Sequence, residues 1–155
     1  MDFEIVLPAI TALTGVIIGG VLTYFTQLLL FQKQIKREKE RQKEEVQIET
    51  MNIYSKFLDV RANLQLIERV NSNVTELNIE AYEKYIRPIF MEKIYLLHFD
   101  VSQKILSINK QLEISGYNEE ITEEEKKWIF KEYMELEYLI FSHLNNYRKK
   151  HNLFN

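Results

Sequence analysis

Uncharged and charged positions divide the chain sharply near its N-terminus. Residues 5–32 run IVLPAITALTGVIIGGVLTYFTQLLLFQ and contain no charged side chain. A helix needs roughly 20 mostly apolar residues to span a bilayer, so we predict a transmembrane helix over 8–31. A buried core helix is the alternative, but core helices of this length usually carry charge on one side. A cleaved signal peptide would need basic residues before the apolar run, where this chain has Asp2 and Glu4, so we expect an uncleaved anchor.

The predicted transmembrane helix has two unequal sides. At 100° per residue, small side chains gather on one side, which carries Ala12, Gly15, Gly19 and Thr23. Small residues let helix backbones approach closely, so we expect these four positions to mediate self-association. The wettable residues of the segment are Thr11, Thr23, Thr26 and Gln27. If several copies assembled with these residues facing inward, the residues would line a pore. In the alternative interpretation they only stabilise a dimer.

A charged segment, residues 32–45, follows the apolar run with the sequence QKQIKREKERQKEE. It contains no Gly or Pro, so we expect a solvated helical stalk. Residues 33–43 hold six Lys and Arg, whereas residues 1–7 hold none. The positive-inside bias therefore predicts a short outer tail at 1–7 and a cytoplasmic C-terminus. The basic excess could also contact the head groups of membrane lipid.

Helical periodicity resumes after the charged segment and predicts an all-α cytoplasmic bundle of about three helices over 46–155. Apolar residues over 46–67 alternate spacings of four and three, which is a heptad seam. With 71–73, Asn-Ser-Asn, as the stop, we expect the first helix to run nearly continuously from Pro8 to about Val70. No segment alternates with period two for long, so the sequence predicts no sheet.

Two further helices are predicted in the bundle. The second extends from about Asn78 to Gly116, which would end it as a C-terminal glycine, with a kink or break at Pro88. The third begins with the capping box of residues 122–125, Thr-Glu-Glu-Glu, and ends in basic residues that complement the helix dipole. Its inward stripe consists of Ile129, Tyr133, Leu136, Ile140, Leu144 and Tyr147.

Composition narrows the chemistry. The 155 residues include no cysteine, and 20 Lys+Arg against 23 Asp+Glu give a formal net charge of −3, which argues against a generally basic nucleic-acid binder. The three histidines, at His98, His143 and His151, are too scattered to suggest a metal centre. Asp100 follows His98 by two positions, and side chains at that spacing point to different faces of a helix. No catalytic motif is present, so we expect a non-enzymatic protein without cofactor or metal.

Two basic clusters could accept the phosphates of a nucleotide-type ligand. Their members are Lys126, Lys127, Lys131, Arg148, Lys149 and Lys150. Solvated helix ends are the alternative interpretation. Nine Tyr and nine Phe, mostly in the cytoplasmic part, could likewise fill the groove of a soluble partner or stack bases, unless they form the core and a homo-oligomer interface.

The order of these parts resembles that of the small single-span bacterial membrane effectors of phage-defence systems, of which the Hailong type of two-gene system is one instance. The shared features are a short outer tail, a Gly-rich span with the run TGVIIGG, a charged helix and a small helical cytoplasmic domain. The resemblance covers the whole chain at the level of layout and assigns no site residue. It implies a homo-oligomeric channel in the bacterial inner membrane, held shut by a nucleotide-derived ligand. The competing hypothesis is a membrane-tethered adaptor or scaffold whose bundle docks a soluble partner.

Overall fold

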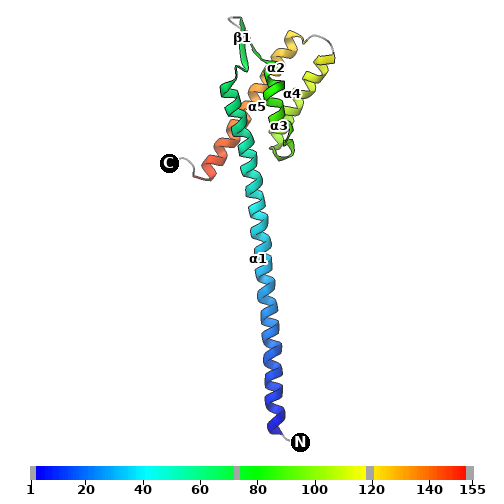
Figure 1. The fold of residues 1–155 in the computed structure, drawn as a ribbon, viewed down its shortest axis with the longest axis vertical. Coiled ribbons are helices and arrows are strands. Elements are labelled where there is room, and N and C mark those ends of the chain that lie inside the picture. The colour runs from blue at the N-terminus through cyan, green and yellow to red at the C-terminus, as the bar shows by residue number, and fades with distance from the viewer. Residues whose placement is uncertain (1–2, 72–73, 118–120, 153–155) are drawn as a thin grey trace. The chain divides into compact units, whose positions relative to one another are not determined.

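The computed structural model of the protein describes residues 3–71, 74–117 and 121–152 (Figure 1). The description covers the backbone of 3–14, 16–17, 69–71, 74–75 and 117 but not their side chains. Helices account for 87% of the structure, which confirms the predicted all-α class. The chain forms two compact units, Met1–Glu45 and Val46–Asn155. The boundary coincides with the predicted end of the charged segment.

The first unit is entirely helical where it is described. Helix α1 extends over Phe3–Asn63, so the predicted span at 8–31 and the charged segment at 32–45 are both helical. Every described side chain from 18 to 45 is exposed. Arg41 forms ion pairs with Glu38 at 2.9 Å and with Glu45 at 3.7 Å. In the described part of the chain, no helix combines the length and the apolar character needed to cross a membrane.

A β-hairpin follows α1, which the sequence did not predict. The helix ends at Asn63 instead of continuing to about Val70. Strands β1, Ile67–Asn71, and β2, Val74–Leu77, pair antiparallel, and Asn71, the first residue of the predicted stop, lies in β1 opposite Val74. The strands are too short for alternation to be visible, and β-branched residues in both favour the extended backbone. The predicted stop residues 72–73 themselves lie outside the described residues.

The segment around Pro88, where the sequence predicted a kink or break, stays helical from Ile79 to Met91 but changes its hydrogen-bond pattern before the proline. A short helix α2, Ile79–Ala81, passes into the π-helical turn η1, Tyr82–Ile86, where the N–H of Arg87 donates to the carbonyl of Tyr82. Helix α3, Arg87–Met91, then begins with the proline in its first turn, where no N–H is needed. The side chain of Asn78 caps α2 by accepting a hydrogen bond from the Ala81 N–H at 2.8 Å.

A second break, which the sequence did not predict, separates α3 from the next helix. The 3₁₀ turn η2, Ile94–Leu96, precedes α4, Phe99–Tyr117. Gly116 lies inside α4, and its φ is not positive, so the prediction that this glycine ends the helix was wrong. Contacts with α1 hold the turn: Lys93 Nζ lies 2.6 Å from Glu49 Oε1, and Thr50 Oγ1 donates to the Leu96 carbonyl at 2.8 Å.

Helix α5, Glu123–Lys150, matches its prediction closely. The Thr122 hydroxyl accepts from the Glu125 N–H at 3.3 Å, and the Glu125 carboxylate accepts from the Thr122 N–H at 2.9 Å, which completes the capping box. Five members of the predicted inward stripe are buried, and Tyr147 packs against them partly buried. Helices α4 and α5 pack together, and the largest fully buried side chains include Tyr54, Phe57, Tyr82, Phe90 and Tyr133.

Candidate functional site

The segment of α1 between Ile18 and Phe31 exposes large apolar side chains over most of its surface, apart from the side that carries Gly19, Thr23 and Thr26. The exposed large residues are Ile18, Val21, Leu22, Tyr24, Phe25, Leu28, Leu29, Leu30 and Phe31. The least exposed, Leu28, still has 39% of its surface open to solvent. A helix that is apolar all round is normally buried in a core or in a membrane, because its surface is costly to hydrate. We call this segment the apolar sleeve.

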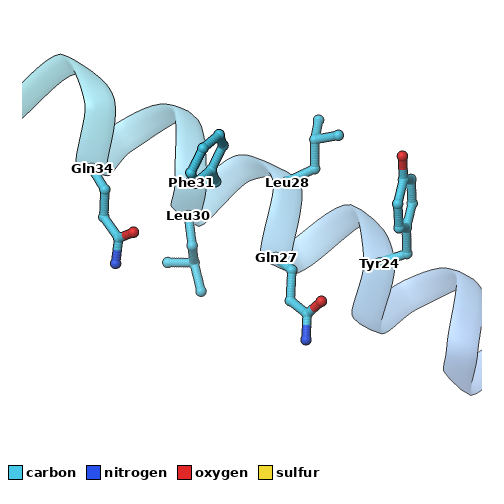
Figure 2. A pocket seen from close by; sticks show the side chains of 6 residues that line it. All are labelled: Tyr24, Gln27, Leu28, Leu30, Phe31 and Gln34. Carbon is cyan, nitrogen blue, oxygen red and sulfur yellow. The ribbon is translucent and has the colours of Figure 1, made fainter.

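Figure 2 shows one pocket along the sleeve and the residues after it, lined by side chains that extend to two sides of the helix axis in this view. One side carries Gln27, Leu30 and Gln34, and the other carries Tyr24, Leu28 and Phe31. The amides of Gln27 and Gln34 thus border this pocket at one edge, and the rings of Tyr24 and Phe31 border it at the other.

Two of the residues predicted to mediate self-association, Gly15 and Gly19, leave space for a neighbouring helix. A Cβ atom added at Gly15 or Gly19 would meet nothing within 4 Å, so both glycines face open space. Thr23 lies four residues beyond Gly19, and its hydroxyl donates to the Gly19 carbonyl at 2.7 Å. Ala12 and Thr11 lie outside the residues whose side chains are described. Contact between two copies at these positions stays a prediction.

The predicted pore-lining residues differ in how their polar atoms are satisfied. The hydroxyl of Thr26 donates to the Leu22 carbonyl at 2.8 Å. The hydroxyl of Thr23 donates in the same way to the carbonyl four residues before it, that of Gly19. Each threonine has thus used its single donor within its own helix. The side-chain amide of Gln27 has no hydrogen-bond partner among the described residues. Among the described wettable residues, Gln27 is therefore the one whose donors need a partner outside the helix.

The basic residues predicted to bind an anionic ligand are partly engaged by carboxylates. Lys126 Nζ lies 2.9 Å from Glu123 Oε1 and 3.5 Å from Glu76 Oε2, and its hydrogen bond to Glu123 raises its pKa. Lys131 Nζ lies 3.9 Å from Glu135 Oε1. The other members, Lys127, Arg148, Lys149 and Lys150, are exposed on α5. Neighbouring acids therefore weaken the first cluster as an anion site, and the second stays a prediction.

A group of four side chains that the sequence did not connect joins α1, α4 and α5. It consists of Tyr54, His98, Asp100 and His143, and we call it the histidine cluster. The Tyr54 hydroxyl lies 2.8 Å from His98 Nδ1, and the rings of His98 and His143 stack with centroids 3.8 Å apart. His143 Nε2 lies 2.9 Å from Asp100 Oδ2. His98 precedes the first residue of α4, so the helical-face argument that separated it from Asp100 did not apply.

The Tyr54 hydroxyl makes two contacts with His98. The backbone N–H of His98 donates to the Tyr54 hydroxyl oxygen at 3.2 Å. The hydroxyl hydrogen can donate to Nδ1 of His98 in the tautomer in which that nitrogen carries no proton. Burial is the largest effect on both groups: it raises the pKa of Tyr54 to about 12 and, with the nearby His143, lowers the pKa of His98. Both effects favour the neutral forms in which this hydrogen bond exists.

Asp100 supplies the negative charge of the histidine cluster. Burial acts to raise its pKa, but hydrogen bonds from His143 and from the Val101 N–H outweigh burial and lower it. Within the described residues, no group of His, Asp or Glu could hold a metal ion. The histidine cluster is therefore a junction between helices whose charge depends on pH.

Comparison with known proteins adds no functional assignment to these two features. No protein-family model, curated protein or solved structure matches the chain. The apolar sleeve and the histidine cluster must therefore be interpreted from their own chemistry. The sleeve exposes large apolar side chains, and the cluster links three helices through hydrogen bonds and stacked rings.

Proposed function

We propose that the protein is a non-enzymatic, single-pass protein of the bacterial inner membrane that self-associates through α1 and permeabilises the membrane. In this proposal the helical unit at 46–155 controls the state of α1, as in the phage-defence effectors that the layout resembles. The observation that carries the proposal is the apolar sleeve, whose exposed side chains need a non-aqueous environment.

The sequence around the apolar sleeve supports its placement in a bilayer. The uncharged run begins at Ile5 and ends at Gln32. A helix of that length extends about 40 Å, which exceeds the roughly 30 Å of the hydrocarbon core. Lys and Arg follow the run directly and are missing before it, which favours an outer N-terminus and a cytoplasmic C-terminus.

Gln27 supports self-association over a simple anchor. A side-chain amide without a partner is costly in hydrocarbon, and a second copy of the same helix offers the matching donors and acceptors. Gly19 lies on the small side of the same helix and faces open space, so a neighbouring backbone could approach closely there. In a ring of several copies, the Gln27 amides would face water at the centre and form the polar wall of a pore.

A membrane-tethered adaptor is the second candidate, and one observation favours it. Met134, Tyr138 and Phe141 lie on the side of α5 opposite its buried stripe and are exposed by 40%, 73% and 43%. Exposed apolar residues at this helical spacing can dock into the groove of a soluble partner. An adaptor would use α1 only as an anchor and would not depend on Gln27.

The test is an ion-flux measurement on the full chain reconstituted into dye-loaded vesicles of phosphatidylcholine and phosphatidylglycerol. We expect the wild-type protein to resist extraction by alkaline carbonate and to release potassium ions. Gln27→Leu should insert equally well but lose at least about tenfold of the flux, because an apolar wall dewets. The matched control, Gln42→Leu, lies beyond the uncharged run and should conduct like the wild type.

Two outcomes would contradict different parts of the proposal. Extraction of the wild-type protein by carbonate would overturn the membrane placement. Stable insertion without any flux would overturn permeabilisation and leave the adaptor as the better explanation.

A further inference from the structure

Positive charge is concentrated in the five residues that follow the uncharged run. Lys33, Lys36 and Arg37 lie within 33–37, which contains no acidic residue and so has a charge of +3. Residues 38–45 contain three basic and four acidic residues, a charge of −1. The charged segment is thus basic at its beginning and slightly acidic in the remainder. The positive-inside bias requires only a basic excess on this side and does not explain the concentration in one turn.

The three basic side chains of this turn share one face and have no acidic partner. Spacings of three and four residues place Lys33, Lys36 and Arg37 next to one another on α1. All three are exposed, and none forms an ion pair with a carboxylate of the described residues. By contrast, Arg41 is engaged by Glu38 and Glu45. Lys39 and Lys43 are also exposed without an ion pair among the described residues, but four carboxylates lie within 38–45, whereas none lies within 33–37. The first basic turn is therefore the part of the charged segment with an uncompensated positive charge.

We propose that Lys33, Lys36 and Arg37 form a binding surface for the phosphates of anionic lipid head groups. The proposal rests on the membrane insertion of α1, which would place this turn at the level of the head groups. Lys supplies a flexible point charge, and the Arg guanidinium can hold a phosphate through two parallel hydrogen bonds. Each basic residue near an anionic surface contributes roughly a fivefold gain in binding.

The geometry favours a lipid over a free phosphate. The three side chains project from the convex surface of one helix and do not enclose a volume that would capture a dilute anion. A bilayer supplies head groups at high local concentration, so a convex surface is sufficient. The nearest acidic residue on the same face is Glu40, which lies about 4.5 Å beyond Arg37 along the helix axis. Its repulsion falls on the side away from the bilayer.

The test compares spin-labelled lipids in vesicles of three parts phosphatidylcholine to one part phosphatidylglycerol that contain the full chain. Electron spin resonance measures the fraction of each labelled lipid that the protein immobilises. We expect the wild-type protein to prefer labelled phosphatidylglycerol several-fold at low ionic strength. The triple variant Lys33→Gln/Lys36→Gln/Arg37→Gln should reduce the preference to near one. The matched control Lys39→Gln/Arg41→Gln/Lys43→Gln removes the same charge from the same helix and should keep most of the preference.

Each alternative result identifies what fails. Equal losses in the two triple variants would mean that overall charge, and not this turn, attracts the lipid, which would overturn the inference. An inserted wild-type protein without lipid preference would also overturn it while leaving the membrane proposal intact. A chain that carbonate extracts from the vesicles would instead overturn the proposed function. Loss of preference in phosphate buffer but not in chloride of equal ionic strength would show a free-phosphate site and contradict the lipid assignment.

Discussion

At the scale of single residues, the uncharged polar side chains of α1 differ in whether their hydrogen-bond donors have a partner within the helix. Thr23 and Thr26 satisfy their hydroxyl hydrogens within α1, whereas Gln27 has no partner among the described residues. In the helical unit, the Tyr54 hydroxyl and the His98 imidazole satisfy each other at 2.8 Å. Gln27 thus differs from the two neighbouring threonines, whereas the side chains of the histidine cluster are hydrogen-bonded in two pairs, Tyr54 with His98 and Asp100 with His143.

The lowered pKa of His98 predicts that the helical unit loses stability on mild acidification. The unfolded chain binds a proton at His98 near its ordinary pKa of about 6.5, before the folded chain does. The free energy of unfolding should therefore fall as the pH drops from 6.5 toward the folded pKa and level off below it. Guanidinium unfolding of the full chain in detergent, followed by fluorescence of the single tryptophan, Trp128, measures this dependence.

The control for this prediction is His98→Asn, which keeps an acceptor for the Tyr54 hydroxyl but does not titrate. Its unfolding free energy should change less between pH 7 and pH 5.5 than that of the wild type. An identical pH dependence in both proteins would show that His98 is not the responsible group.

At the scale of elements, the cap that starts a helix and the surface through which a helix packs have separate effects. The capping box at Thr122 starts α5 by satisfying N–H groups that the helix itself leaves open, independently of the rest of the fold. The small side of α1 has the opposite character, because nothing in its own chain packs against Gly15 or Gly19. Changes at these two places should therefore affect different properties: the stability of the domain and the association of copies.

Removal of the α5 cap should destabilise the helical unit by about 1 kcal/mol. Thr122→Ala deletes the oxygen that accepts from the Glu125 N–H and leaves that donor without its partner. The same tryptophan-monitored unfolding measures the loss, and Thr122→Ser, which retains the hydroxyl, should recover most of it. Equal losses in the two variants would show that the methyl group, and not the cap, is responsible.

Gly19→Leu should weaken self-association of α1 without disturbing the fold of the chain. A Cβ atom at this position would meet nothing within 4 Å among the described residues of its own copy, so we expect the loss to arise between copies. We expect dissociation to become easier by about 1–2 kcal/mol, roughly tenfold, because the backbones can no longer approach closely. Cross-linking in detergent at a series of protein concentrations measures the change.

The matched control for Gly19→Leu is Val21→Leu, which adds bulk on the opposite side of the helix. It should leave the oligomer unchanged. If Gly19→Leu also has no effect, the helical unit alone drives assembly.

At the scale of the whole molecule, charge divides the chain into parts suited to different environments. Residues 5–32 are uncharged, and positive charge begins at Lys33. The chain forms two compact units with a boundary after Glu45, so the charged segment belongs to the first unit. The first unit therefore contains both the exposed apolar sleeve and the charged segment that follows it.

The charge asymmetry predicts that the C-terminus lies in the cytoplasm. A reporter that is active only in the periplasm, fused after Asn155, should stay inactive in bacterial cells, whereas a cytoplasmic reporter at the same position should be active. Inverting the asymmetry by Asp2→Lys and Glu4→Lys with Lys33→Gln, Lys36→Gln and Arg37→Gln should increase the periplasmic signal. A periplasmic signal from the wild-type fusion would reverse the proposed orientation.

The sequence by itself determined the helical class, the start of α5 and a helical irregularity next to Pro88, because each depends on contacts within a few residues. Capping at Thr122 and the missing N–H of Pro88 act locally and need no partner from elsewhere in the fold. Only the tertiary structure decided that the chain turns into a hairpin after Asn63 and breaks again around Lys93. No local breaker marks either place, and at Lys93 contacts with α1 outweigh helix propensity.

The same distinction applies to the candidate sites. The two sides of α1 follow from helical spacing alone, because the segment is one regular helix. The histidine cluster could not be predicted in this way, since Tyr54 and His98 are 44 residues apart and Asp100 and His143 are 43 apart. Sequence patterns report periodicity within an element, whereas a junction between elements exists only when packing brings their side chains together.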